Sequence, residues 1–429
     1  MANSIRTVVV LGASGTIGSL TGGLIAQSGI KVYFLSRTLT GAKRGLEKAI
    51  SQARSEVISR NIVCGDYDTL LKSALEEADW IIECVSENLT IKQEMYEKVD
   101  QYRKPGAIVS STTSSLPLSH LLEGRSENFR RNFLAAHFYN PPTKMLACEI
   151  TGTSNIDPEI LKFMANFLKT ELRRVVIPVR NTAGFAGNRI AFTLFNQITV
   201  LAAEYGVEMM DYLIGQYTGR LMPPLATLDL VGLDIYKAIT ENLYEYTNDE
   251  MHNSLILPDY VNKMIHNGAL GNKTPNNGGF YKKDASGNCL YLNLITLDYV
   301  RAKKSHVVFV EAAKDMIHWG KYREAFDIIK TSCCKEADIV MDILCTYIAY
   351  SYARIGEVTE GEFGIDGIDK VMSFGYNWAS PSLIVNMLGG REYVLELLEK
   401  KGFEVPNSLK KARESARQVP NAGKYFLSR

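Results

Sequence analysis

Hydrophobic side chains in the first 180 residues occur in short continuous runs that alternate with stretches of helical periodicity. The first run, Thr7–Leu11, is rich in β-branched residues and is typical of a strand covered on both faces. The same pattern predicts strands at residues 32–35, 61–64, 80–85, 107–110, 133–138, 148–151 and 174–179. Helices are predicted between them, including residues 41–60, 70–77, 91–102 and 159–172. This regular alternation predicts a doubly wound, mostly parallel sheet.

From about Asn181 the hydrophobic positions follow a helical period almost to the end of the chain. Residues 272–288, rich in Gly, Asn and Lys, interrupt this pattern, and the chain then reads as helical to about residue 401. An Asp, a Pro and a Gly recur at nearly the same spacing, as Asp211, Pro224 and Gly232 and again as Asp369, Pro381 and Gly389. This weak repeat favours two duplicated helical units, although unrelated helical hairpins could share these residues by coincidence.

Composition narrows the class of protein. Lys and Arg total 48 and Asp and Glu total 47, so the net charge of +1 lacks the basic excess of a nucleic-acid binder. Hydrophobic residues make up 46%, enough for a globular core, and no run is apolar and long enough to span a membrane. The 7 Cys residues form no CxxC pair, and the first residues lack the apolar stretch of a signal peptide. We therefore expect a cytoplasmic protein with reduced thiols, no nucleic-acid partner and no metal site.

A glycine-rich turn follows the first predicted strand and precedes the first predicted helix. Glycine permits the tight turn and the close approach of a pyrophosphate, and the helix N-terminus offers free N–H groups. Because the turn lies in an alternating strand–helix pattern, we predict a Rossmann dinucleotide site. Its expected contacts are Gly12, Ser14, Gly15, Thr16, Ile17 and Gly18.

The end of the second predicted strand bears on the choice of nucleotide. An NAD site usually has an acid there, which binds the ribose 2′-hydroxyl. This chain has Ser36 and Arg37, and a hydroxyl with a guanidinium suits a 2′-phosphate. The sequence therefore favours NADP over NAD as the cofactor, while a solvated Arg at a strand end is the plain alternative.

Candidate chemistry is sought first among the 6 His residues. His137 ends an apolar predicted strand, where ligand-facing residues of an open α/β sheet collect, and Glu149 lies on the next predicted strand. A strand, a Pro turn and a return strand could bring the two side chains together, so that the carboxylate orients the imidazole for proton transfer from an alcohol. On spacing alone, a satisfied core His and a separate surface Glu remain open.

Several segments in order resemble the 3-hydroxyacyl-CoA dehydrogenase family. HFYNPPTKMLACE resembles the family's HFFNP…E block, and SSTTSSL resembles its SNTSSL segment. NTAGFAGNR resembles TPGFxxNR, ECVSENLTIK resembles EAxxENLxxK, and GRLMPPLATLDLVGLD resembles the helical-domain signature that ends in DxxGLD. The departures are Thr112 and Ala183, where the family has Asn and Pro, and the glycine turn, which reads GxxGxxG instead of GxGxxG.

The resemblance implies reversible oxidation of an L-3-hydroxyacyl thioester, similar to 3-hydroxybutyryl-CoA, with CoA or an acyl-carrier protein as the carrier. The family's catalytic residues map onto His137, Glu149, Ser114 and Asn188, and its Asn beside the catalytic His maps onto Asn140. Its cofactor-lining Glu and Lys map onto Glu87 and Lys92, and Ser114 also lies beside the cofactor.

The predicted domains are an α/β Rossmann domain over residues 1–180 and all-α domains over 181–283 and 284–429. The last resembles the second, degenerate helical copy of longer family members. Members with one helical domain form homodimers through it, so two copies in one chain predict a monomeric pseudo-dimer, with a homodimer as the alternative. Two other functions remain open here, a dehydrogenase of a free hydroxy acid or sugar acid and a nucleotide-binding relative without turnover.

Overall fold

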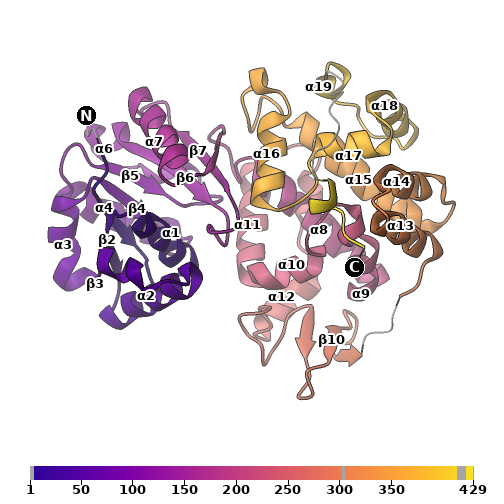
Figure 1. Cartoon of the computed structure of the whole chain (residues 1–429), viewed down its shortest axis with the longest axis horizontal. Helices are drawn as coiled ribbons and strands as arrows, with labels where there is room; N and C mark the ends of the chain where they lie inside the picture. Colours follow the sequence, from indigo (N-terminus) through magenta and orange to yellow (C-terminus); the bar gives the residue numbers. More distant parts are fainter. Residues whose placement is uncertain (1–3, 302–304, 413–421, 429) are drawn as a thin grey trace. The chain divides into compact units, whose positions relative to one another are not determined.

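The computed structural model describes residues 4–301, 305–412 and 422–428 (Figure 1). The chain forms two compact units. The first comprises Met1–Phe185 together with Phe374–Tyr376, and the second comprises Ala186–Ser373 together with Asn377–Arg429. Within the described ranges 4–301, 305–412 and 422–428, no helix is both long and apolar enough to cross a membrane.

The first unit is built on an eight-stranded sheet with the order β3-β2-β1-β4-β5-β6-β7-β8. The strands are β1 (Thr7–Leu11), β2 (Lys31–Ser36), β3 (Ile62–Asp66), β4 (Trp80–Glu83), β5 (Ile108–Ser111), β6 (Phe133–Phe138), β7 (Ala147–Gly152) and β8 (Val175–Pro178). All neighbouring strands are parallel except β6 and β7, which are antiparallel. The strand order reverses between β1 and β4, which is where a doubly wound sheet binds its ligand. The predicted doubly wound, mostly parallel sheet is confirmed.

Helices cover this sheet and join its parallel strands. They are α1 (Thr16–Gln27), α2 (Leu39–Ala53), α3 (Tyr67–Glu77), α4 (Leu89–Tyr102), α5 (Leu118–Leu121), α6 (Glu127–Arg131) and α7 (Pro158–Thr170). The helix predicted over residues 41–60 ends earlier, because Arg54 adopts a left-handed conformation with φ 51°. A 3₁₀ helix, η1 (Glu56–Asn61), then leads into β3.

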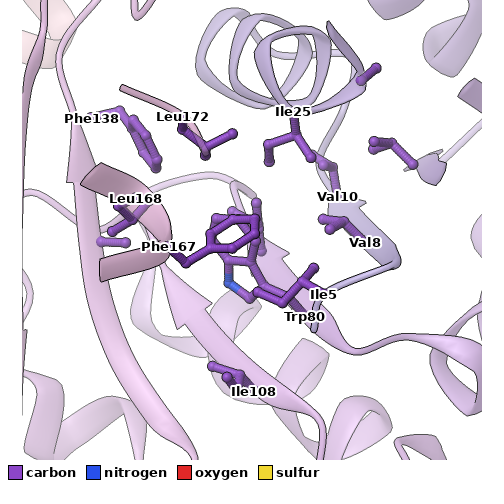
Figure 2. Close-up of a cluster of buried hydrophobic side chains, with 14 of the residues drawn as sticks. Ile5, Val8, Val10, Ile25, Trp80, Ile108, Phe138, Phe167, Leu168 and Leu172 are labelled. Carbon is purple, nitrogen blue, oxygen red and sulfur yellow. The ribbon is translucent and has the colours of Figure 1, made fainter. Parts of the chain in front are cut away.

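The core of the first unit lies where α1 and α7 pack against one face of the sheet (Figure 2). Val8 and Val10 of β1 project onto this face, since alternate residues of a strand point the same way. Trp80 is completely buried, and its ring meets Phe167 of α7 edge-on at a centroid distance of 5.9 Å. Its indole N–H donates a hydrogen bond of 2.9 Å to Ser110 Oγ, so the only polar atom of this large side chain is satisfied. This core fixes β1 and β4, whose ends carry the candidate site.

The second unit is mainly helical. Its α-helices are α8 (Gly187–Tyr205), α9 (Val207–Leu213), α10 (Pro224–Val231), α11 (Leu233–Tyr246), α12 (Asp259–His266), α13 (Val308–His318), α14 (Tyr322–Thr331), α15 (Lys335–Ala353), α16 (Asp366–Gly375), α17 (Pro381–Leu388), α18 (Arg391–Lys400) and α19 (Asn407–Lys410). Short 3₁₀ helices connect them, namely η2 (Gln216–Thr218), η3 (His252–Leu255), η4 (Gly361–Phe363) and η5 (Ala422–Lys424).

The Gly- and Asn-rich break leads into a small antiparallel sheet that the hydrophobic pattern did not predict. Its strands are β9 (Tyr281–Lys283), β10 (Cys289–Leu292) and β11 (Tyr299–Arg301), in the order β11-β10-β9. Most of their side chains are exposed or half-buried, so the strands carry no strong apolar signal. Residues 289–301, expected to be helical, are therefore the main error in the predicted secondary structure.

The repeated Asp, Pro and Gly have the same structural role in both places. Asp211 accepts hydrogen bonds from the backbone N–H groups of Leu225 (2.7 Å) and Ala226 (2.9 Å) in the first turn of α10, which begins at Pro224. Asp369 likewise accepts from the backbone N–H of Ser382 (3.2 Å) in the first turn of α17, which begins at Pro381. The two helices end at Gly232 (φ 100°) and Gly389 (φ 116°). We call α8–α11 the first repeat and α15–α18 the second repeat.

The long helices that open the two repeats, α8 and α15, pack against each other. At this contact, Arg189 of α8 binds Asp249 (Nη2 to Oδ2, 2.6 Å) and donates from Nε to the hydroxyl of Tyr350 on α15 (2.7 Å). Arg354, which follows α15, binds the same Asp249 oxygen from Nη1 at 2.6 Å. Burial opposes ionisation of Asp249, but the hydrogen bond and charge of Arg189, together with hydrogen bonds from Tyr350 and the Met251 backbone, outweigh it and lower its pKa. Asp249 therefore joins the two repeats, and Glu357, which also binds both arginines, does the same.

The buried carboxyl of Asp211 generates a prediction about stability and pH. Burial raises its pKa from 3.8 to about 6, despite the N–H donors of α10. The folded state therefore retains the proton between about pH 4 and 6 while the unfolded state loses it, so stability falls as pH rises through this window. Asp211→Asn removes this proton-binding group, so we compare its free energy of unfolding with that of the wild type. The difference, wild type minus variant, should fall by up to about 3 kcal/mol between pH 4 and 6 and should stay constant above pH 6. Urea unfolding of both proteins at several pH values measures this difference.

Candidate active site

His137 and Glu149 are direct cross-strand partners in the antiparallel pair β6–β7. Because directly opposed residues project from the same face of a sheet, their side chains meet. Nδ1 of His137 lies 2.7 Å from Oε2 of Glu149, with His137 7% exposed and Glu149 completely buried. The strand, Pro turn and return strand therefore bring the two predicted residues into contact at the carboxyl end of β6.

A tyrosine that sequence reasoning did not single out completes this cluster. The hydroxyl of Tyr139 donates a hydrogen bond of 2.7 Å to Oε2 of Glu149, the same oxygen that contacts His137. The rings of Tyr139 and His137 meet edge-on with centroids 4.8 Å apart, and the ring of Phe185 lies 6.0 Å from the imidazole. The available signal was the HFYNP string itself, in which Tyr139 stands where the resembling family has a second Phe.

The glycine turn joins β1 to α1 and leaves no room for side chains at two positions. Gly12 has φ 85°, and a Cβ there would lie 2.4 Å from the carbonyl oxygen of Cys84. A Cβ on Gly18 would lie 2.7 Å from the carbonyl oxygen of Gly12. Gly15 is the N-cap of α1 without a side-chain hydrogen bond, so the first N–H groups of the helix are not capped by its side chain. These features fit the pyrophosphate of a dinucleotide.

Two polar residues end β2 beside this turn, and their environments differ. Ser36 is 3% exposed, and its hydroxyl donates a hydrogen bond of 2.6 Å to the carbonyl oxygen of Thr38. Arg37 is exposed, and it lies close enough to Tyr67 for its charge to oppose the burial that raises the pKa of that phenol to about 12. The Tyr67 hydroxyl in turn accepts from the backbone N–H of Gly12 at 2.9 Å. Arg37, more than Ser36, is therefore available to a ligand at the turn.

A buried ionic network lies at the ends of β4 and β5. Lys92 of α4 is 1% exposed and binds both carboxylate oxygens of Glu83 at 2.8 and 2.9 Å. Glu83 also accepts from the hydroxyls of Tyr96 (2.6 Å) and Ser111 (2.8 Å). Burial opposes the charge on Lys92, but Glu83 and Glu87 outweigh it and raise its pKa. Lys92 therefore remains charged in a site where an unpaired ammonium would be very costly.

Glu87 connects this network to the loop that contains Ser114. Its Oε2 lies 3.2 Å from Lys92 Nζ, and its Oε1 accepts from Thr113 Oγ1 (2.6 Å) and from the backbone N–H of Ser114 (3.0 Å). Burial opposes ionisation of Glu87, yet the charge of Lys92 and these hydrogen bonds lower its pKa. Glu87 and Lys92 thus position the loop after β5. Sequence reasoning missed Glu83, the hub of the network, although it is the first residue of the ECVSEN string.

The remaining predicted residues occupy different places. Ser114 is half-buried in the loop after β5, which neighbours β6, so it lies at the same edge of the sheet as His137. Asn140 is exposed just after β6. Asn188 belongs to the second unit, where it is 4% exposed in the first turn of α8. At Thr112, where the resembling family has Asn, the hydroxyl donates to the carbonyl oxygen of Glu83 at 3.1 Å.

Comparison with known proteins agrees with this description. Residues 7–182 match the family model of the 3-hydroxyacyl-CoA dehydrogenase NAD binding domain, and residues 184–283 match that of the 3-hydroxyacyl-CoA dehydrogenase C-terminal domain. A probable 3-hydroxyacyl-CoA dehydrogenase of Bacillus subtilis is 31% identical over 98% of this chain and 55% of its own length. One of Deinococcus radiodurans is 32% identical over 65% of this chain and 83% of its own length. The chain thus spans about half the length of the Bacillus relative.

Solved structures share the fold. The 3-hydroxybutyryl-CoA dehydrogenase of Escherichia coli superposes with a TM-score of 0.66 at 17% identity, covering 93% of this chain and 94% of that one. The (S)-3-hydroxybutyryl-CoA dehydrogenase of Ralstonia eutropha superposes with a TM-score of 0.53 at 25% identity, covering 63% and 97%.

The first unit has the fold and glycine turn of a nicotinamide-dinucleotide-binding oxidoreductase. The chain belongs to the 3-hydroxyacyl-CoA dehydrogenase family.

Proposed function

We propose that this protein catalyses the reversible oxidation of an L-3-hydroxyacyl thioester, similar to 3-hydroxybutyryl-CoA, to the 3-oxo thioester. The observation that carries the proposal is the contact of 2.7 Å between His137 and Glu149 at the carboxyl edge of a dinucleotide-binding sheet. Ligands of open α/β sheets bind at this edge, so the pair lies where a substrate would meet the cofactor. A free hydroxy acid or sugar acid is a less favoured substrate, because the relatives named above act on acyl-CoA.

His137 would transfer the proton of the substrate hydroxyl. Its Nδ1–H is donated to Glu149, so the tautomer fixed by this bond leaves a lone pair on Nε2 to accept that proton. As the imidazole becomes cationic, the buried carboxylate stabilises it, and in the reverse direction the cation returns the proton. The bound nicotinamide supplies the hydride acceptor, and the protein provides orientation.

Other residues would hold the substrate. Ser114 and Asn188 would bind its hydroxyl and thioester, and Asn140 would lie beside His137 in the substrate site. These roles rest on the match of each residue to its family motif, and for Ser114 also on the position of its loop next to β6. The carrier of the acyl group would be CoA or an acyl-carrier protein.

The proposed cofactor is NADP, with NAD as the alternative. The turn around Gly12 and Gly18 fits either dinucleotide, because it approaches only the pyrophosphate. Arg37 supports NADP, since an exposed guanidinium at the end of β2 can bind a 2′-phosphate in place of the usual acid. Glu87 and Lys92 would stabilise the loop that borders the nicotinamide side.

The proposed domains remain 1–180, 181–283 and 284–429, with the last two packed as a pseudo-dimer in one chain. The bridge that Asp249 forms between the two repeats supports this arrangement. All 7 Cys are free thiols, which supports a reducing compartment such as the cytoplasm.

Substitution of His137 tests the proposed chemistry. Turnover of acetoacetyl-CoA by His137→Gln should be about 10²–10⁴-fold slower than that of the wild type, since a positioned general acid–base contributes that much. Absorbance of the reduced nicotinamide measures the rate. Exposed His318→Gln should retain full activity. Near-normal turnover by His137→Gln contradicts the assignment, and activity with free 3-hydroxybutyrate but not with its CoA thioester would favour the free-acid alternative.

Cofactor preference tests the role of Arg37. The wild type should have a higher kcat/KM for NADPH than for NADH, and Arg37→Ser should reduce this preference about 10- to 100-fold, because one charge-assisted contact to the 2′-phosphate is lost. Arg60→Ser, which removes an exposed Arg after α2, is the matched control. A wild type that prefers NADH would show that the cofactor is NAD.

The oligomeric state tests the pseudo-dimer. Light scattering coupled to size exclusion should give the mass of a single chain at all accessible concentrations. A stable dimer would show instead that the repeats inside one chain do not replace a partner subunit.

A further inference from the structure

We infer that Tyr139 is a positioning residue that sets the pH range over which the His137–Glu149 pair transfers protons. This inference rests on the function proposed above. It concerns a side chain that the motifs assigned no role and that contacts the carboxylate directly.

One oxygen of Glu149 receives two hydrogen bonds of equal length. Tyr139 Oη and His137 Nδ1 each lie 2.7 Å from Oε2, so the phenol and the imidazole share the same acceptor. Glu149 is completely buried and Tyr139 is 6% exposed, so water is not available to replace the phenol. The edge-on contact between the Tyr139 and His137 rings holds both donors in place.

The hydroxyl of Tyr139 keeps its proton near pH 7 and therefore remains a hydrogen-bond donor. Burial and the negative charge of Glu149 raise the pKa of Tyr139 well above its usual value of 10. Because this hydroxyl stays protonated, its hydrogen bond reduces the effective negative charge of the Glu149 carboxylate over the whole pH range of the assay. Less charge then remains to stabilise a cationic imidazole, so loss of the Tyr139 hydrogen bond would favour the charged form of His137.

Other titratable groups near the carboxylate do not compete with this effect. Among the described residues they include Cys148 on β7, Tyr376 in the short segment of the first unit, and Arg174, which lies near Cys148. Burial raises the pKa of both Cys148 and Tyr376, so both remain neutral near pH 7. Arg174 stays charged across the same range, although burial lowers its pKa. His137 is therefore the group near Glu149 whose charge Tyr139 controls.

Position 139 is also a point at which this chain differs from the motif it resembles. The HFFNP block has Phe where this chain has Tyr139, and Phe cannot donate a hydrogen bond. Tyr139→Phe thus removes one oxygen atom and one hydrogen bond while preserving the ring contact with His137. The volume of the side chain hardly changes, so the effect of the substitution can be assigned to the lost hydrogen bond.

The experiment compares pH profiles of wild type and Tyr139→Phe in the direction of hydroxyacyl oxidation. In this direction the imidazole must be neutral, so kcat/KM rises with pH along an ascending limb. We expect the midpoint of that limb to move to higher pH by about 0.5–1 unit in Tyr139→Phe, as one charge-assisted hydrogen bond is lost. Tyr33→Phe is the matched control, because Tyr33 also donates to a carboxylate, that of Glu77, on a different part of the sheet. Its profile should match the wild type.

A second readout does not depend on activity. NMR of protein with labelled His can follow the titration of His137. The chain has 6 His residues, and the signal of His137 is the one that is missing from the spectrum of His137→Gln. The midpoint of this titration should move in the same direction as the kinetic limb. If Tyr139→Phe does not fold, 3-fluorotyrosine at position 139, a stronger donor, should move both midpoints to lower pH instead.

The outcomes separate this inference from the proposed function. Unchanged kinetic and NMR midpoints in an active Tyr139→Phe protein overturn the role of Tyr139 and leave the dehydrogenase intact. A wild type without thioester dehydrogenase activity overturns the proposed function, while the NMR midpoint still tests the effect of Tyr139 on His137.

Discussion

The antiparallel pairing of β6 with β7 is the constraint on which the candidate site depends. In the eight-stranded sheet it is the pair of neighbouring strands that runs antiparallel, while the others are parallel. This pairing puts an acid directly opposite an imidazole, and because directly opposed side chains share a face, their contact needs no further loop to hold it. The acid is completely buried, and His137 and Tyr139 both form hydrogen bonds with it.

The buried charge of Lys92 in the first unit is balanced by acids. Lys92 stands between two carboxylates, and hydroxyl groups and backbone N–H groups satisfy the remaining oxygens. Removing one member of such a network usually costs several kcal/mol, about 3–5, because it leaves an uncompensated charge. The network therefore makes the loop after β5 rigid, and it does so with residues that need not touch a substrate. Positions that match family motifs can thus act on the site indirectly.

Much of the first unit could be predicted because buried parallel strands read as continuous apolar runs. The glycine turn and the pairing of His137 with Glu149 followed from spacing and resemblance. Tyr139 could not be assigned from the sequence, since an aromatic residue next to an apolar strand is more often plain core, and only the position of its hydroxyl shows otherwise. The strands β9–β11 were missed for the opposite reason, because short exposed strands have no apolar pattern to detect.

The bridge through Asp249 limits how the two helical repeats can diverge. Arg189 comes from the first repeat and Arg354 follows the long helix of the second, yet both neutralise the same carboxylate. Replacing either arginine with an uncharged residue would remove one of the cations that bind this carboxylate, and the other repeat also contacts the same carboxylate. Two separate stretches of the chain therefore depend on the same acids, Asp249 and Glu357, since each acid binds both arginines.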